Sequence, residues 1–143
     1  MRVLGVDFGL RHLGIALSDE GGILARPLRV LHVTSVRNAP AAVAEVAAEA
    51  DAGTIVVGVP MGLEGEERRE EVRRVERFAH ALRKLSGLDV FLVDESLSSR
   101  EAEGAPGSST AAGADDSAQH ARAAAVILQR WLDRPRKSKG AEA

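Results

Sequence analysis

The sequence predicts one α/β domain built on a mixed five-stranded sheet with helices on both faces. Two features of the chain predict this class. Three short strand-like segments come first, and two apolar segments then alternate with long helical patterns. Consecutive strands form an antiparallel meander, whereas alternation of strand and helix produces parallel strands. A chain of 143 residues is also long enough to bury one hydrophobic core.

The meander is expected at the N-terminal end of the chain. Residues 2–7 and 13–18 are short and apolar, and the five residues between them suit a hairpin connection. Gly9 and Gly14 are expected to keep this hairpin slim, so that a ligand backbone can approach. A third strand is expected over residues 26–33, with Pro27 confined to its start or to the edge of the sheet.

Helices and strands are expected to alternate in the rest of the chain. An Ala-rich helix is predicted over residues 40–51, with Asn38 as a possible cap and Gly53 at its end. The β-branched run at 54–59 is typical of a central parallel strand. A long helix at 66–86, ended by Gly87, has one apolar face and one face of interleaved charges, such as Glu70 with Arg74. The predicted apolar face consists of Val72, Val75, Phe78, Ala79, Leu82 and Leu85.

The C-terminal part is expected to contain one strand and two helices. The strand covers residues 88–93, and a short helix covers 98–103. A low-complexity loop at 104–113 precedes the last helix, which starts at Asp115 or Asp116 and stops near residue 133, before Pro135. One side of that helix is predicted to carry Ala123, Val126, Ile127, Arg130 and Trp131, with Ala124 and Leu128 nearby.

Composition limits the class of protein. Residues 1–133 are expected to form the domain, and the basic residues 134–143 a disordered tail. The chain has no cysteine, which excludes disulfides and Cys-based zinc sites. No segment has the pattern of a membrane span or a signal peptide, so a cytoplasmic protein is expected. A net charge of −2 neither favours nor excludes nucleic acid as a partner.

Acidic residues follow two of the predicted strands and begin the last helix. Asp7 ends the first strand, Asp94 and Glu95 end the fifth, and Asp116 lies one helical turn before His120. The carboxyl ends of parallel neighbouring strands meet at one edge of a sheet, where α/β folds place their sites. Carboxylates brought close together repel each other unless a cation lies between them.

Oxygen ligands of this kind suit Mg²⁺ or Mn²⁺. Two such ions about 4 Å apart hydrolyse phosphodiester bonds, and Asp7 is the natural residue to bridge them. A structural role is the alternative: Asp94 as a helix cap, Glu95 as a first-turn acid and Asp7 as a turn residue. From the residues alone, both interpretations remain open.

Four segments of the chain resemble the YqgF/RuvX family, which belongs to the ribonuclease H-like superfamily and is related to Holliday-junction resolvases. The segment VLGVDFGLRHLGIALSD resembles the family's opening Asp-x-Gly motif, and IVVGVPMGLEG resembles its Val-Val-Gly-Leu-Pro loop. VDESLSSREAE resembles the family's Asp-Glu-Arg-Leu-Ser-Thr segment, and ARAAAVILQRWLD its final helix. The resemblance covers nearly all of residues 1–133 and implies a ribonuclease H-like fold.

The resemblance also implies a divalent-metal nuclease that acts on branched DNA or matures the 5′ end of 16S ribosomal RNA. Asp7 and Glu95 match two of the family's catalytic acids. The third acid, nine residues before Gln129, is replaced by His120. Either His120 is itself a ligand, or Asp116 substitutes for the missing acid, or the site is weakened. Loss of one negative charge predicts a preference for Mn²⁺ over Mg²⁺.

Nucleic acid is the partner that the resemblance implies, bound by a monomer or a homodimer. The family's loop before the last helix is usually basic, but residues 104–113 contain no basic residue. Arg11, Arg100 and Arg122 therefore become the candidate phosphate contacts.

Two other classes of function are compatible with parts of the sequence. One is a catalytically silent nucleic-acid-binding protein that keeps the fold, which the replacement at His120 favours. The other is an actin-like or sugar-kinase-type phosphotransferase, whose phosphate loop also reads Asp-x-Gly. That class needs a second domain of similar size, for which 143 residues leave no room.

Overall fold

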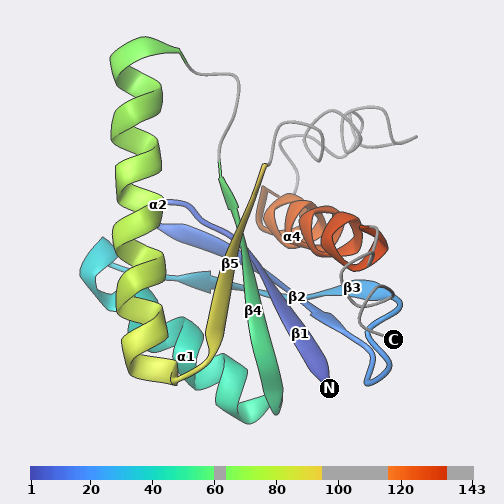
Figure 1. Ribbon diagram of the computed structural model, residues 1–143. Coiled ribbons are helices and arrows are strands. Elements are labelled where there is room, and N and C mark those ends of the chain that lie inside the picture. The colour runs from blue at the N-terminus through green and yellow to red at the C-terminus, as the bar shows by residue number, and fades with distance from the viewer. Residues whose placement is uncertain (60–63, 95–115, 135–143) are drawn as a thin grey trace, which may run out of the picture.

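The computed structural model describes residues 1–59, 64–94 and 116–134 (Figure 1). The predicted short helix at 98–103, the loop at 104–113 and the tail from residue 135 lie outside the described residues. The elements are β1 (Arg2–Asp7), β2 (His12–Ser18), β3 (Ala25–His32), the 3-10 turn η1 (Val36–Asn38), α1 (Ala39–Glu49), β4 (Ala52–Val59), α2 (Gly65–Ser86), β5 (Asp89–Asp94) and α4 (Asp116–Asp133).

The five strands form one mixed sheet in the order β3-β2-β1-β4-β5. β1, β2 and β3 pair in an antiparallel meander, and β1, β4 and β5 run parallel. The predicted fold class is therefore confirmed. β1 lies at the centre of the sheet, and β3, which contains Pro27, lies at its edge.

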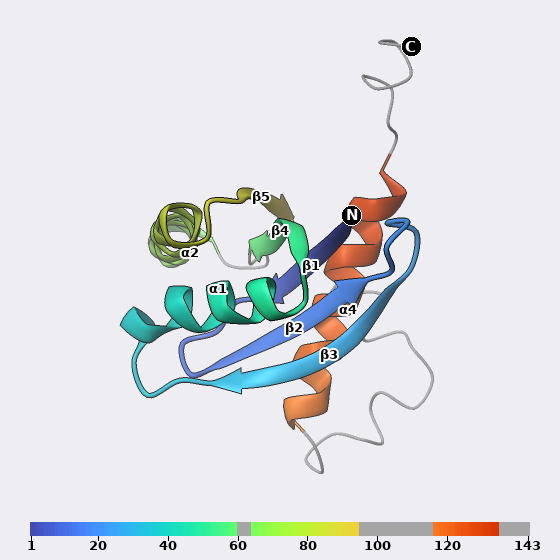
Figure 2. The ribbon, with the colours of Figure 1, turned by 90° about the horizontal axis from the view of Figure 1, so that it is seen from below.

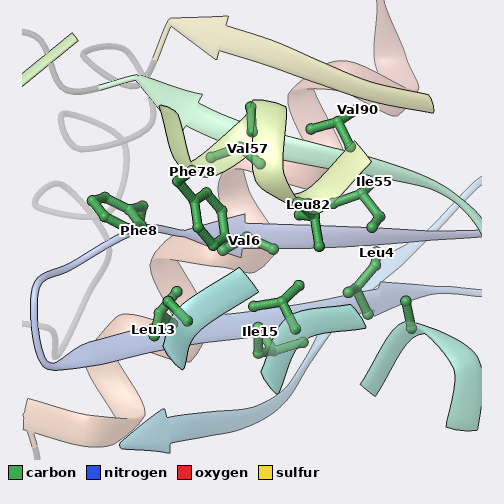
Figure 3. Packing of buried hydrophobic residues seen from close by; sticks show 14 of the residues in the cluster. Leu4, Val6, Phe8, Leu13, Ile15, Ile55, Val57, Phe78, Leu82 and Val90 are labelled. Carbon is green, nitrogen blue, oxygen red and sulfur yellow. The ribbon is translucent and has the colours of Figure 1, made fainter. Parts of the chain in front are cut away.

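Helices cover both faces of the sheet. Among the helices of the described residues, α1 and α2 lie on one face and α4 on the other, as Figures 1 and 2 show. The larger hydrophobic cluster lies between the sheet and the α1–α2 layer, where Phe78 and Leu82 of α2 meet the strands (Figure 3). The smaller cluster lies beneath α4 and contains Val3, Ala16, Val56, Ala124, Ile127, Leu128 and Leu132.

Alternation along β1 decides which residues face which layer. Leu4, Val6 and then Phe8 belong to the cluster under α1 and α2, and the Phe8 ring lies 4.8 Å from the Phe78 ring (Figure 3). Successive side chains of a strand point to opposite faces, so Gly5 and Asp7 face α4.

The first helix differs from its prediction at both ends. Asn38 has a helical backbone and makes no capping bond, whereas Ser35 caps the preceding turn by accepting a hydrogen bond from the N–H of Arg37. The helix ends at Glu49 rather than just before Gly53, and Asp51 takes the left-handed conformation (φ 59°). Aspartate tolerates this conformation. Gly53 lies in β4, where a Cβ would overlap the side chain of Met1.

The long helix α2 follows its predicted pattern with two exceptions. Its buried residues are Val75, Phe78, Ala79 and Leu82, and Gly87 ends it with φ 73°. Leu85 is 59% exposed and does not belong to the buried face. The predicted pair of Glu70 and Arg74 is also wrong, because Arg74 pairs with Glu71 at 3.1 Å. Such surface pairs add little stability.

The last helix begins at Asp116, as predicted, but its buried face agrees with the predicted one only at Ile127 and at the nearby Ala124 and Leu128. Ala121, Ala124, Ile127, Leu128 and Leu132 are buried. Trp131 lies instead beside the half-exposed Phe91, with a ring separation of 5.6 Å. No helix within the described ranges combines the length and the apolar character that a membrane span requires.

Replacement of Leu82 by alanine is expected to lower the free energy of unfolding by about 2–5 kcal/mol, because it leaves a cavity between α2 and the sheet. Leu85→Ala removes the same atoms one turn later on the same helix, and we expect a change within about 0.5 kcal/mol. Urea unfolding followed by circular dichroism measures both. Equal losses in the two variants would contradict the packing described for α2.

Candidate active site

Asp7 lies at the carboxyl end of the central strand and is 8% exposed. It is one of two buried polar residues in the described part of the chain, the other being Ser18. A buried carboxylate needs a hydrogen-bonding or ionic partner, because desolvation of its charge is costly. Its partner therefore has to come from the α4 face of the sheet.

The geometry of α4 supplies that partner. Two residues of a strand advance about 6.7 Å, and four residues of a helix advance about 6 Å. Every second residue of β1 therefore meets every fourth residue of α4 over a short distance. A Cβ at Gly5 would lie 2.8 Å from the Cβ of Leu128 and 3.1 Å from the carbonyl oxygen of Ala124. Two residues further along β1, Asp7 meets His120, four residues before Ala124.

Gly14 makes the approach of the helix possible. It is the residue of β2 that pairs with Asp7, and a Cβ there would overlap the backbone carbonyl oxygen of His120. The backbone of α4 therefore rests directly on the sheet beside Asp7. We expected Gly14 to leave space for a ligand backbone, but α4 occupies that space. Gly9 does keep the hairpin tight, because a Cβ there would overlap the carbonyl oxygen of His12.

His120 places Nδ1 3.3 Å from Oδ2 of Asp7. The side chain of His120 is 37% exposed, whereas that of Asp7 is 11% exposed. The imidazole therefore lies at the mouth of the site and the carboxylate at its base. The separation suits a long hydrogen bond, and it also suits two neighbouring ligands of one cation, which lie about 3 Å apart when each bond is about 2.1 Å.

Two further histidines extend this site, and the sequence analysis missed both. His12 of β2 stacks on His120, with ring centroids 5.7 Å apart and an interplanar angle of 15°. His32 of β3 meets His12 edge-on at 4.7 Å. The sequence did contain one pattern that could have identified His12. Side chains alternate along β2, so His12, Gly14 and Ala16 share one face, the same face of the sheet as Asp7.

Other predicted site residues are only partly within the described structure. Glu95 and Arg100 lie outside the described residues, and for Asp116 and Asp94 only the backbone is described. Asp116 is the first residue of α4, one turn before His120, and Asp94 ends β5 beside Val59. Among the described side chains, no three carboxylate or imidazole groups lie close enough to hold a metal ion.

The predicted phosphate contacts that can be located are both exposed. Arg11 lies in the connection between β1 and β2, where its carbonyl oxygen accepts a hydrogen bond from the N–H of Val33. This bond joins the two connections at the Asp7 end of the meander. Arg122 lies on α4, two residues after His120.

The end of the opening motif has a structural role. Ser18 accepts a hydrogen bond from the N–H of Val3 at 2.8 Å. The carboxylate of Asp19 accepts hydrogen bonds from the N–H groups of Leu24 and Ile23, and these bonds lower its pKa below the usual value. Ser18 thus ties the end of β2 to the start of β1, and Asp19 closes the β2–β3 turn, both at the far end of β1 from Asp7.

Comparison with known proteins identifies the family. The family model described as "RuvX: Holliday junction resolvase" matches residues 1–134. The chain belongs to the RuvX family. The family and the activity class predicted from the four motifs, a nuclease that hydrolyses phosphodiester bonds, are thereby confirmed.

Relatives and solved structures agree with this assignment. A protein of Anaeromyxobacter sp. (strain Fw109-5), named "Putative pre-16S rRNA nuclease", is 38% identical over 134 residues, which are 93% of this chain and 97% of the relative. One of Maridesulfovibrio salexigens with the same name is 36% identical over 138 residues, 94% of this chain and 99% of the relative. Thermus thermophilus RuvC, solved with a Holliday junction, has a TM-score of 0.61 at 20% identity, covering 92% of this chain and 93% of RuvC. The last comparison confirms the ribonuclease H-like fold.

Replacement of Gly14 by alanine is expected to destabilise the protein by about 1–3 kcal/mol, because the new methyl group overlaps the backbone of His120 and α4 has to shift. Thermal unfolding measures the loss. Gly21→Ala is the matched control, since its Cβ would meet its nearest neighbour at an ordinary 3.6 Å. A Gly14→Ala protein as stable as the control would show that the helix does not depend on this contact.

Proposed function

We propose that Asp7 and His120 form the core of a divalent-metal site for hydrolysis of phosphodiester bonds in structured nucleic acid. The observation that carries this proposal is the contact between them. A carboxylate buried at the end of the central strand faces an imidazole on the helix that crosses it, with 3.3 Å between Oδ2 and Nδ1. The family assignment supports the proposal independently.

The donor set fits a divalent cation of intermediate hardness. Asp7 offers carboxylate oxygens and His120 a ring nitrogen, a combination that suits Mn²⁺ better than Mg²⁺. Glu95 and Asp116 are the further ligands that we propose. In support, β5 runs parallel to β1, with β4 between them, and ends at Asp94, the residue before Glu95 in the sequence.

The roles of the residues follow from their positions. Asp7, at the base of the site, would hold the cations. His120, at the mouth, binds a cation or moves a proton between the cleaved bond and solvent. When bound, the cations activate the attacking water and stabilise charge on the leaving oxygen. Arg11, Arg100 and Arg122 are the proposed contacts to phosphate.

Branched DNA and precursor 16S rRNA are the two candidate substrates. The first follows from the description of the family, and the second from the names of the relatives. Either substrate is compatible with the predicted cytoplasmic location. Symmetric cleavage of a junction requires a two-fold homodimer, whereas RNA trimming does not. Gel filtration of the protein with each labelled substrate separates the two cases.

A binding protein without catalytic activity is the second candidate function. The observation that favours it is His120 itself, which stands where the motif calls for an acid. The phosphotransferase alternative gains no support, because relatives that match over nearly their whole length are named as nucleases.

Asp7→Asn is expected to reduce Mn²⁺-dependent cleavage by at least about 100- to 1,000-fold while the fold remains intact, because it removes the buried anionic ligand but keeps the shape of the side chain. Cleavage of a labelled four-way junction, single-stranded RNA and duplex DNA measures this, with circular dichroism as the check on folding. Asp19→Asn, in a turn far from the site, is the matched control and should cleave like the wild type. Equal activity of the Asp7 variant would exclude the mechanism, and an inactive wild type would favour the binding protein.

His120→Asp is expected to shift the metal preference towards Mg²⁺, because it replaces a nitrogen donor with an anionic oxygen. We expect the ratio of Mg²⁺-supported to Mn²⁺-supported cleavage to rise roughly 10-fold over the wild type. His120→Asn is the matched control, of similar size but without the charge. An unchanged ratio in the aspartate variant would show that His120 is not a metal ligand.

A further inference from the structure

We propose that His12 is a positioning residue that orients the imidazole of His120 towards Asp7. His12 is not one of the site residues expected from the sequence. Its ring nevertheless lies nearly parallel to the ring of His120, with 5.7 Å between the ring centroids. The inference rests on the proposed function, because the orientation of His120 matters for metal binding and cleavage only if His120 takes part in them. The orientation itself can be tested without activity.

The backbone of the sheet fixes His12 in place. It is the first residue of β2, and its register partner in β3 is His32. Directly paired residues of antiparallel strands project to the same face, and here that face is the one covered by α4. Gly14, two residues later on the same face, holds the backbone of His120 against the sheet. His12 and His120 are therefore brought together by two backbone contacts, independently of their side chains.

His12 adds to the contacts that orient the ring of His120. Gly14 fixes the backbone of His120, and its side chain, which is 37% exposed, has two rotatable bonds, χ1 and χ2. A ring in another rotamer would turn Nδ1 away from Oδ2 of Asp7. The parallel face of His12 restricts this rotation, because the ring of His120 can lie flat on it only in a narrow range of angles. His32, at 4.7 Å and 86°, supports the edge of His12 in turn.

This arrangement resembles the way in which metal-binding histidines are generally oriented by neighbours that do not touch the metal. Loss of such a neighbour typically weakens metal binding or activity 10- to 100-fold. His12 contributes a ring face rather than a hydrogen bond, so we expect an effect at the lower end of this range. A flat aromatic ring without nitrogen atoms should replace it. That expectation separates positioning from a direct role as ligand, proton carrier or phosphate contact.

The first test observes His120 in the metal-free protein. The chain has four histidines, so ring ¹H–¹⁵N correlation spectra can be assigned by single substitutions. In the wild type at pH 8 we expect His120 to show one dominant ring tautomer. In His12→Ala we expect the averaged pattern of a mobile imidazole, and in His12→Phe the wild-type pattern. His80→Ala, on the surface of α2, is the matched control. An unchanged His120 pattern in His12→Ala would overturn the proposal whether or not the enzyme is active.

The second test measures cleavage as a function of Mn²⁺ concentration. For His12→Ala we expect the Mn²⁺ concentration at half-maximal rate to rise about 10-fold, with an unchanged KM for nucleic acid. His12→Phe should restore the wild-type value to within about 2-fold, and His32→Ala should show a smaller change in the same direction. A raised KM for nucleic acid that phenylalanine does not rescue would overturn the proposal and make His12 a substrate contact. If the wild type cleaves nothing, the proposed function fails, and the spectra of the metal-free protein alone decide the role of His12.

Discussion

The close contact between α4 and the centre of the sheet is the constraint on which the candidate site depends. A helix normally packs on a sheet through side chains on both sides, but here the strands contribute glycine at the two nearest points. Gly5 lies under Ala124 and Leu128, and Gly14 lies under the backbone of His120. With a side chain at either position, α4 would have to shift away from β1 and β2. The same contacts that build the smaller core therefore set the distance between Asp7 and His120.

This packing also explains why a carboxylate can occupy the end of the central strand. Asp7 is buried by α4 and by the hairpin, so its charge is partly removed from water. Uncompensated, that burial would destabilise the fold. A cation bound by Asp7, with His120 as a second ligand, would compensate it. Stability and function are thus coupled at this residue, and a neutral side chain of the same shape should fold at least as well as Asp7.

The sequence predicted the mixed sheet, most of the buried face of α2 and the place of Asp7 at a strand end, because each depends on local patterns and on the rules of parallel connection. It predicted the buried face of α4 only in part. Ile127 is buried as expected, and so are its named neighbours Ala124 and Leu128, but Trp131 is only partly buried. The strands below present Gly5 and Ala16, which lets the Ala124 side of the helix come close to the sheet. His12 and His32 were missed for a related reason. Their proximity depends on strand register, which no pattern within either strand reveals.

The register between β2 and β3 depends on one irregularity. Ala16 pairs with Pro27, but Ile15 pairs with Arg29, so Leu28 is an extra residue at a bulge. If the pairing continued without the bulge, His12 would face Leu31, and His32 would lie beyond the end of β2. The bulge shifts the last part of β3 by one residue and turns His32 to the face of α4. Pro27, which cannot donate a backbone hydrogen bond, stands beside the shift. A local feature of an edge strand therefore determines which side chain supports His12 at the site.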